Sequence, residues 1–564
     1  MHKPAFSAAA VLGALVASIA LSGAAPPSEQ AEQAPQTFAL QDVRSLPPPA
    51  KPARPVPSRR LGIDLQAVPQ VGLAAPDRQA LIAEDEARKG LQKALRFGVG
   101  RSLTLRAADG HWYDLRGGAR LWVAEVSSAE ALGLRVHFSR MRLPAGAELA
   151  VYSPPGPETR MVTATYGAAG TRRPEFWTRT FPGDRVRIEY LVPAGVAGQE
   201  IPFTVDRLQH VYRNPVAEPQ AVTKAASCNN DVSCHPEWQD VANAVAGIGV
   251  IDNDSLFCSG TLLNSQQQDF TPYYLTASHC LYSDEAARSA EIYWFYQTPG
   301  CGEIAPSLTS VPSSLGARLL ATHPDTDFTL LLIEGALPPG VSWAGWTTEP
   351  APEGASVTGI HHPSGDYKRI SFAVRPTEPC RNTNLVRVHW TNGPIEPGSS
   401  GSGIFRDDTH QLFGQLFLGI SECRSLGWSC YGDFSLTYPR IQNYLREGPD
   451  DPSEPNDTCA KPRLAKTGTL RGLTVKLNDT DWYRIKVPRG RTLTVTLSFP
   501  QSDGDVDAKL YGRCGFDPLV ASEGTGDTEV LTFKNRSRWA ANLSWQVYLA
   551  SDTRASYDMA VSIR

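Results

Sequence analysis

The uneven placement of ten cysteines is the feature that most limits how this chain of 564 residues can fold. None precedes Cys228, eight lie between Cys228 and Cys430, and two, Cys459 and Cys514, follow. An even number in each block favours pairing within the block, as expected in an oxidising compartment. No Cys-x-x-Cys spacing occurs, so a zinc site is the poorer explanation. The cysteines therefore predict a cysteine-free N-terminal region, a cross-linked central domain and a C-terminal domain with one disulfide.

The first residues have the pattern of an export signal. Lys3 precedes an apolar run from Ala8 to Leu21, and the small residues Ser22 to Ala24 suit a cleavage site. A membrane anchor would need a span nearer ~20 residues and more basic flanks. We therefore expect a signal peptide over residues 1–24 and a secreted protein, extracellular or periplasmic, without a membrane anchor.

Changes in composition divide the rest of the chain. Proline-rich sequence predicts an extended spacer, and helical composition over Ala75–Leu95 precedes a series of alternating strand patterns. We expect a spacer over residues 25–75, a β-rich domain over 76–224, a β-rich central domain over 225–447, a linker over 448–458 and a small β-sandwich over 459–564. The net charge of -4 and the lack of a basic block argue against a nucleic-acid partner.

The central domain contains a glycine-rich turn, Glu396–Gly403, after the strand-like segment Leu385–Trp390. Its glycines allow a sharp backbone turn that exposes the Ser400 hydroxyl and directs the amides of Gly398 and Ser400 into one small space. A lone Gly/Ser run is more often a flexible surface loop. A serine nucleophile also requires a base and an orienting acid from elsewhere in the chain.

Two upstream segments offer these groups. Tyr274–Cys280 has the pattern of a strand that ends in small residues and delivers His279, and Cys258 could hold this turn through a disulfide with Cys280. Asp327 opens an apolar strand, with Asp325 as a neighbouring competitor. Taken alone, His279 or Asp327 would more often have a structural role than a catalytic one. Together, in this order, His279, Asp327 and Ser400 predict a triad for acyl transfer.

This order is that of chymotrypsin-fold serine proteases, and residues 228–445 resemble the lysyl endopeptidase group of secreted bacterial serine proteases. The matching motifs are Cys228–Cys234, Cys258–Leu262, Ala277–Cys280, Asp327–Leu331, Trp343–Trp346, Ile360–Pro363, Lys368–Ile370, Glu396–Gly401 and Gly414–Leu416. The resemblance implies an all-β fold, with a chymotrypsin-like double β-barrel between a β-rich pro-domain and the C-terminal β-sandwich. It also implies the disulfides Cys228–Cys423, Cys234–Cys301 and Cys258–Cys280.

The resemblance further implies the role of each site residue. His279 would be the general base, Asp327 would orient it, and the amides of Gly398 and Ser400 would bind the oxyanion of an acyl-enzyme reaction. Substrates would be proteins or peptides. We expect a monomer without cofactor or metal.

The sequence departs from the group at the specificity pocket. Lysine preference in the group depends on an acid two residues before a Tyr-Gly pair, and Ser429 stands at that position. A hydroxyl cannot neutralise a buried ammonium group, so strict lysine specificity is not expected. Strand alternation leaves the direction of the nearby Asp433 open. The pocket is expected to be uncharged and to accept apolar or small side chains.

The residues expected to line this pocket are Phe417, Leu418, Gly419 and Ser429. Phe417 replaces the group's pocket histidine, and the pocket tryptophan has no counterpart around Glu378–Cys380. Cys380 and Cys430 are additional to the group's cysteines, and we expect them to pair across the pocket.

Maturation is expected to follow a route other than that of trypsin. Ser399 stands where trypsin-type enzymes have the aspartate that receives the freed N-terminus. We expect instead that residues 76–224 act as an intramolecular inhibitor and folding template. Cleavage is expected within Ala221–Ser227, after Lys224. If the mature pocket disfavours lysine, another protease would make this cut.

The C-terminal region resembles the bacterial pre-peptidase C-terminal domain. The matching motifs are Glu454–Asp457, Asp479–Tyr483, Asp505–Asp507 and Leu510–Tyr511. A disulfide between Cys459 and Cys514 would stabilise it. Asp505 and Asp507 suggest calcium, but exposed turn acids are the commoner explanation.

Two other functions compete with the protease interpretation. The first is a catalytically inactive protease fold that serves as a binding or adhesion protein, although all three triad residues are present. The second is an esterase with the same triad. The chain lacks the α/β alternation and the Ser-Asp-His order of those folds.

Overall fold

The computed structural model describes residues 37–38 and 55–564, apart from gaps at 66, 88–93, 155–162, 168–173, 197–199, 214–224, 267–269, 381–383, 446–452, 454–455, 457, 477–479, 502–503 and 552–553. The predicted signal peptide, most of the spacer, Lys224 and most of the linker lie outside the described residues. Within these ranges, no helix is both long and apolar enough to cross a membrane.

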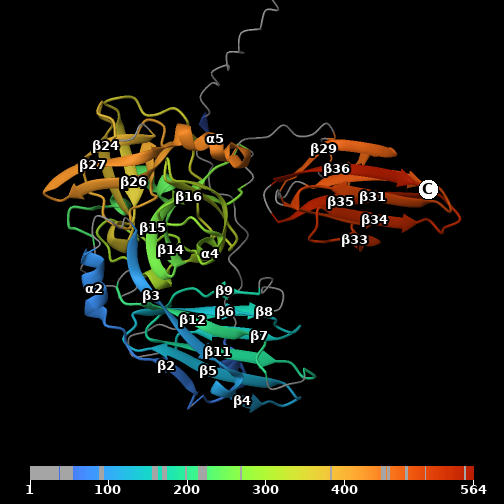
Figure 1. Cartoon of the computed structure of the whole chain (residues 1–564), viewed down its shortest axis with the longest axis horizontal. Helices are drawn as coiled ribbons and strands as arrows, with labels where there is room; N and C mark the ends of the chain where they lie inside the picture. Colours follow the sequence, from blue (N-terminus) through green and yellow to red (C-terminus); the bar gives the residue numbers. More distant parts are fainter. Residues whose placement is uncertain are drawn as a thin grey trace, which may run out of the picture. The chain divides into compact units, whose positions relative to one another are not determined.

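The N-terminal domain is built mainly from strands (Figure 1). Its elements are α1 (Pro57–Leu61), β2 (Gln70–Leu73), α2 (Arg78–Ala87), β3 (Leu95–Leu105), β4 (His111–Asp114), β5 (Arg120–Ser128), β6 (Gly133–Ser139), β7 (Glu148–Tyr152), β8 (Thr163–Gly167), β9 (Phe176–Trp177), β10 (Phe181–Pro182), β11 (Arg185–Val192) and β12 (Thr204–Val211). Two sheets enclose one core that includes Trp122, Leu134 and Ile188.

Two expectations for this region are wrong. The segment predicted as a spacer contains α1 and β2, and Ser58 of α1 donates hydrogen bonds from its amide and hydroxyl to Glu189 in the domain. The helix predicted over Ala75–Leu95 is shorter, because Leu95 already begins β3. The pairing of β3 with strands distant in sequence outweighs the helical propensity of its first residues.

The central domain begins with a short strand and continues into the first barrel. The elements are β13 (Asn230–Asp231), α3 (Gln239–Ala242), β14 (Val245–Asp252), β15 (Asp254–Leu263), β16 (Tyr273–Ala277), α4 (Asp284–Arg288), β17 (Glu291–Tyr293), β18 (Ser313–Leu315), β19 (Ala317–His323) and β20 (Phe328–Ile333). Pairing runs from β18 through β17, β14, β15, β16 and β20 to β19.

The second barrel follows and closes on itself. Its elements are β21 (Trp346–Thr347), which pairs with β1 (Thr37–Phe38), then β22 (Ser356–His361), β23 (Arg369–Val374), β24 (Leu385–Asn392), β25 (Gly403–Arg406), β26 (Leu412–Glu422), β27 (Ser425–Asp433) and α5 (Phe434–Leu445). Pairing runs from β22 through β23, β24, β27, β26 and β25 back to β22. The domain therefore has the chymotrypsin-like double β-barrel that was expected.

The N-terminal domain and the first barrel share a sheet. Strand β3 pairs with β12 on one side and with β15 on the other, so that Leu95 lies opposite Phe257. Phe97 and Val211 join Phe257 and Tyr293 in one apolar cluster. This pairing has no counterpart in the sequence patterns, because backbone hydrogen bonds between distant strands leave no local signature.

The C-terminal domain is a sandwich of two sheets. One sheet contains β28 (Arg463–Leu464), β30 (Asp481–Val487), β35 (Ala541–Ser551), β32 (Asp505–Tyr511) and β33 (Val520–Ser522), and the other contains β29 (Gly468–Lys476), β36 (Arg554–Ile563), β31 (Thr492–Ser498) and β34 (Thr528–Lys534). Alternate residues of β30 and β31 are buried in a shared core, as a period of two requires. The expected β-sandwich is confirmed.

All ten cysteines form disulfides. The pairs are Cys228–Cys423, Cys234–Cys301, Cys258–Cys280, Cys380–Cys430 and Cys459–Cys514. They coincide with the expected pairs. Four of them lie within the central domain and one within the C-terminal sandwich.

Candidate active site

The pairing of β16 with β20 brings His279 and Asp327 together. Ala277, the last residue of β16, lies opposite Phe328, the first residue of β20. Because the strands are antiparallel, the turn that leaves β16 and the turn that enters β20 meet at one end of the barrel. The amide of Ser278 donates to the carbonyl oxygen of Asp327 over 2.8 Å and joins the two turns.

The Asp327 carboxylate holds the His279 residue at two points. Its Oδ2 lies 2.6 Å from His279 Nδ1, and its Oδ1 accepts the His279 backbone amide over 3.0 Å. Asp327 is 3% exposed and has a φ of 56°, an uncommon conformation for a residue other than glycine. A carboxylate on Nδ1 favours the tautomer with a proton there, which leaves Nε2 as the acceptor.

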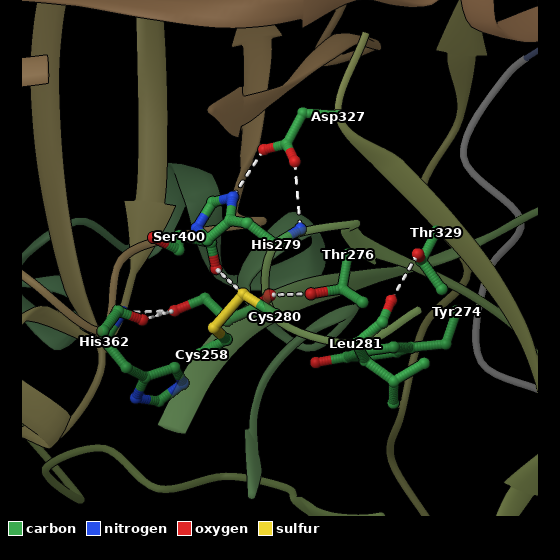
Figure 2. The surroundings of a disulfide bond; sticks show 12 residues. Cys258, Tyr274, Thr276, His279, Cys280, Leu281, Asp327, Thr329, His362 and Ser400 are labelled. Carbon is green, nitrogen blue, oxygen red and sulfur yellow. Dashed lines mark hydrogen bonds and ion pairs between the residues drawn. A yellow bond between two sulfur atoms is a disulfide. The ribbon is translucent and has the colours of Figure 1, made fainter. Parts of the chain in front are cut away.

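His279 Nε2 is buried and has no hydrogen-bond partner among the described residues. Figure 2 shows Ser400 on the side of the imidazole that faces away from Asp327. Ser400 is 5% exposed. In unliganded active sites the hydrogen bond between nucleophile and base is often long, and it tightens when substrate binds.

Two glycines shape the turn that carries Ser400. Gly398 has a φ of 99° and Gly401 a φ of 81°, values that favour glycine. A Cβ on Gly398 would come within 2.9 Å of the His362 carbonyl oxygen. The turn is closed by the amide of Ser399, which donates to the carbonyl oxygen of Glu396 over 3.0 Å.

Strand β15 of the first barrel fixes this turn of the second barrel. The Ser259 amide donates to the carbonyl oxygen of Ser400 over 2.8 Å, and the Ser259 hydroxyl donates to that of Gly398 over 2.9 Å. The adjacent Cys258 forms the disulfide with Cys280, next to His279 (Figure 2). One strand therefore holds both the serine turn and the histidine turn.

The competing acid Asp325 lies elsewhere. Its carboxylate is 3.5 Å from His323 and 3.5 Å from Arg440, and its side chain is 53% exposed. The structure therefore brings Asp327, and not Asp325, to His279.

The expected pocket residues occupy neighbouring strands. Gly419 of β26 lies opposite Ser429 of β27, and Leu418 lies opposite Cys430. Ser429 is fully buried, and its hydroxyl accepts a hydrogen bond from Trp390 Nε1 over 2.8 Å. A Cβ on Gly419 would lie 3.0 Å from the Ile395 side chain. These contacts are apolar or uncharged.

Phe417 and Asp433 are the two remaining residues considered for the pocket. The Phe417 ring centroid lies 6.2 Å from that of His279. Asp433 accepts hydrogen bonds from the amide and hydroxyl of Ser435 at the start of α5. The Asp433 carboxylate therefore forms these hydrogen bonds at the end of β27, away from Ser429.

Sequence reasoning missed three residues of this site: Ser259, Trp390 and Glu396. Ser259 lies in the Cys258–Leu262 motif, but its place beside a cysteine gives no signal of the hydrogen bonds that it makes. Trp390 lies outside the region around Glu378–Cys380 in which the resemblance implies a pocket tryptophan. Glu396 belongs to the predicted serine turn, and the structure places it beside Ala226 and Asn229.

No group of three or more His, Cys, Asp or Glu side chains suited to a metal ion occurs in the described part of the chain. Asp505 and Asp507 lie on β32 of the C-terminal sandwich, where burial and the neighbouring acids raise the pKa of Asp507 to about 7.

Comparison with known proteins supports a family assignment. The model of the lysyl endopeptidase N-terminal domain matches residues 72–212, and that of the lysyl endopeptidase C-terminal domain matches residues 222–432. A curated relative, the lysyl endopeptidase of Pseudomonas aeruginosa, is 29% identical over an alignment of 294 residues that covers 48% of this chain and 63% of the relative. The chain thus spans less than two thirds of that relative.

Solved structures that match parts of this chain include a protease from M. tuberculosis in its active form and a serine endoprotease from Yersinia pestis. The first is 16% identical with a TM-score of 0.27 and covers 42% of this chain and 96% of its own. The second is 17% identical with a TM-score of 0.28, and the match covers 37% of this chain and 65% of the endoprotease chain. From its two matched domains, the chain belongs to the lysyl endopeptidase-like proteases.

Proposed function

We propose that this protein is a secreted serine endopeptidase, made as a proenzyme, that hydrolyses peptide bonds through His279, Asp327 and Ser400. The observation that carries the proposal is the 2.6 Å contact between Asp327 Oδ2 and His279 Nδ1, on the ring whose other nitrogen faces Ser400. The serine turn anchored by Ser259 adds a second, independent support.

The proposed reaction has two stages. His279 Nε2 takes the proton of the Ser400 hydroxyl as its oxygen attacks the substrate carbonyl carbon, and Asp327 stabilises the resulting imidazolium. The proton then passes to the leaving amine, and the acyl group remains on Ser400. Water attacks this ester by the same route and releases the acid. The amides of Gly398 and Ser400 bind the oxyanion, each worth roughly 3–4 kcal/mol.

The pocket contacts support a specificity that is not strictly for lysine. Ser429 has its hydroxyl engaged by Trp390, and Gly419 and Ile395 add apolar surface. A substrate ammonium group at this depth would lose its hydration without meeting a carboxylate, because Ser429 has only a hydroxyl and the Asp433 carboxylate bonds Ser435. We therefore propose cleavage after apolar or small residues.

The N-terminal domain is proposed to act as folding template and inhibitor of the protease domain. Arg135 donates to the carbonyl oxygen of Ser289 over 2.7 Å, and Thr180 donates from its amide to the buried carboxylate of Glu291 over 2.8 Å. These contacts and the β3–β15 pairing support a role of the N-terminal domain as a folding template for the first barrel. A template is useful there because the non-local strand pairs of a barrel form slowly.

The function is tested with a serine-directed organophosphonate on the secreted, matured protein. Covalent labelling of wild type and none of Ser400→Ala is the expected result. Digestion of a peptide library by the same preparation gives the residue preference. An intact, folded protein that neither reacts with the phosphonate nor cleaves any peptide would favour the alternative function, a protease-fold binding or adhesion protein.

A further inference from the structure

The first described residues after the domain junction are tied to two carboxylates. Ala225 is 4% exposed, and its backbone nitrogen lies 3.4 Å from Asp366 Oδ2. The Ala226 amide donates to Glu396 Oε1 over 2.8 Å, and Asn229 Nδ2 donates to the same oxygen over 2.8 Å. This short segment immediately follows Lys224 in the sequence, the expected site of cleavage.

Both carboxylates belong to loops that support Ser400. Glu396 begins the serine turn, and its carbonyl oxygen accepts the Ser399 amide. Asp366 lies in the loop after β22, where the Ser364 amide donates to the carbonyl oxygen of Pro397 over 2.7 Å. Ser364 also donates from its hydroxyl to Glu396. These hydrogen bonds join the two loops into one unit next to Gly398.

Carboxylates outnumber guanidinium groups among the residues named at this unit. Arg369 donates to Asp366 Oδ2 over 2.7 Å, and both side chains are almost fully buried. A surface depression beside Ala226 and Glu396 also contains Glu422 and Arg424. The charged groups named here are three carboxylates, Asp366, Glu396 and Glu422, and two guanidinium groups, those of Arg369 and Arg424.

Cleavage after Lys224 would add a cation at this unit. Water adds across the peptide bond, its oxygen remains on the Lys224 carboxylate, and the Ala225 nitrogen becomes a free amine. An α-amino group has a pKa of about 7.7–8.0 and is mostly protonated at neutral pH. The neutral amide near Asp366 would become an ammonium group, and a charge-assisted hydrogen bond is roughly twice as strong as a neutral one.

We propose that Asp366 is a positioning residue that binds the α-ammonium group of Ala225 after processing, while Glu396 anchors Ala226, and that this binding rigidifies the loop carrying Ser400. The inference rests on the proposed function and on the expected cleavage after Lys224. Ser399 is not the receptor, since its hydroxyl lies 2.8 Å from His361 Nδ1. Burial lowers the pKa of His361 to about 3, so this ring is neutral.

The test compares two mature chains that differ only in where they begin. In both, residues 221–224 of the full-length protein are replaced by the recognition sequence of an added protease. One variant is cut directly before Ala225, and the other carries one extra alanine before Ala225. All side chains of the site are the same in both, but the extended chain places its ammonium group one residue away from Asp366.

The expected result is a kcat/KM on small peptides that is about 10- to 100-fold lower for the extended chain, the range of a charge-assisted hydrogen bond. Asp366→Asn should lower kcat/KM in the chain that begins at Ala225 and have little further effect in the extended chain. A merely structural role of Asp366 would lower it equally in both. Thermal unfolding of both backgrounds shows whether this substitution disturbs folding.

Equal activity of the two chains, or equal losses on Asp366→Asn, would overturn the inference. Organophosphonate labelling separates this outcome from failure of the proposed function. If both chains are labelled at Ser400 and are equally active, only the N-terminal receptor is wrong. If neither is labelled although both are folded, the serine protease itself is wrong.

Discussion

The backbone amide of Ser259 donates a 2.8 Å hydrogen bond to the carbonyl oxygen of Ser400. Ser259 lies on β15 of the first barrel, and Ser400 lies on a turn of the second. The next residue back on β15, Cys258, is bonded to Cys280 beside His279. The position of the nucleophile relative to the base therefore depends on one strand that contacts both turns.

Ser259→Ala tests this dependence. It removes the hydroxyl that donates to Gly398 over 2.9 Å and accepts the His362 amide over 3.0 Å, and it keeps the backbone bond to Ser400. Loss of these bonds costs about 1–3 kcal/mol at a buried site. We expect kcat to fall about 10-fold with little change in KM, measured on a peptide substrate.

Ser255→Ala is the matched control for this variant. Ser255 is buried on the same strand, but its hydroxyl donates to Gln209 of the N-terminal domain. We expect lower stability of the uncleaved proenzyme and no loss of kcat in the matured enzyme. A similar fall of kcat in both variants would show that general loosening of β15 is responsible.

Asp327→Asn should remove most of the activity. The amide would no longer stabilise the imidazolium and would favour the wrong tautomer of His279, and the analogous change in the Ser-His-Asp template lowers kcat about 10⁴-fold. Asp325→Asn, two residues away and paired with His323 and Arg440, should leave kcat within a factor of about two. If Asp325→Asn lowered kcat more than Asp327→Asn under the same conditions, Asp325 would be the acid that orients His279.

Ser429→Asp should create a preference for lysine. The new carboxylate would lie beside Trp390 and could pair with a substrate ammonium group in the pocket. We expect the ratio of kcat/KM for lysine over apolar substrates to rise at least about 10-fold, the effect of a pair worth ~1.4 kcal/mol. Asp433→Asn is the control, because Asp433 bonds Ser435 and should affect stability alone. If Asp433→Asn changed the substrate preference, the specificity pocket would not be the one at Ser429.

Replacing Cys258 and Cys280 together by alanine should affect both stability and activity. The disulfide closes a sequence separation of 22 residues, and such a loop is worth about 3 kcal/mol in unfolding free energy. His279 would also lose the covalent support of its turn. The double replacement of Cys459 and Cys514 should destabilise the C-terminal sandwich and leave kcat unchanged. Calorimetry and peptide hydrolysis on both variants test this contrast.

Lys368 should make stability depend on pH. Burial lowers the pKa of its ammonium group from 10.5 to about 7 in the folded protein. Between these values the unfolded chain binds more protons, so the unfolding free energy rises with pH by up to ~1.4 kcal/mol per unit from this residue. The contribution reaches its minimum below pH 7. Relative to Lys368→Met, wild type should lose stability as pH falls from 9 to 6, as followed by denaturant unfolding; parallel curves would contradict this.

Local patterns in the sequence were sufficient to predict several parts of this protein. Alternation of apolar residues reflects the geometry of a strand, so it predicted β16, β20 and a β-sandwich for the C-terminal domain. The order and immediate surroundings of His279, Asp327 and Ser400 predicted the candidate site, and the two cysteine blocks predicted which domains contain disulfides. Each of these signals lies within a few residues of the feature that it predicts.

Only the tertiary structure decided which distant groups meet. The sequence did not reveal that β3 continues the sheet of the first barrel, that Trp390 bonds Ser429, or that Ala225 lies next to Asp366. The contacts join residues 39 positions apart in the Trp390–Ser429 pair, 141 in the Ala225–Asp366 pair and 162 in the Leu95–Phe257 pair. They are made through backbone hydrogen bonds or single side chains. Such contacts depend on how the barrels close, and barrel closure is a property of all the strands together.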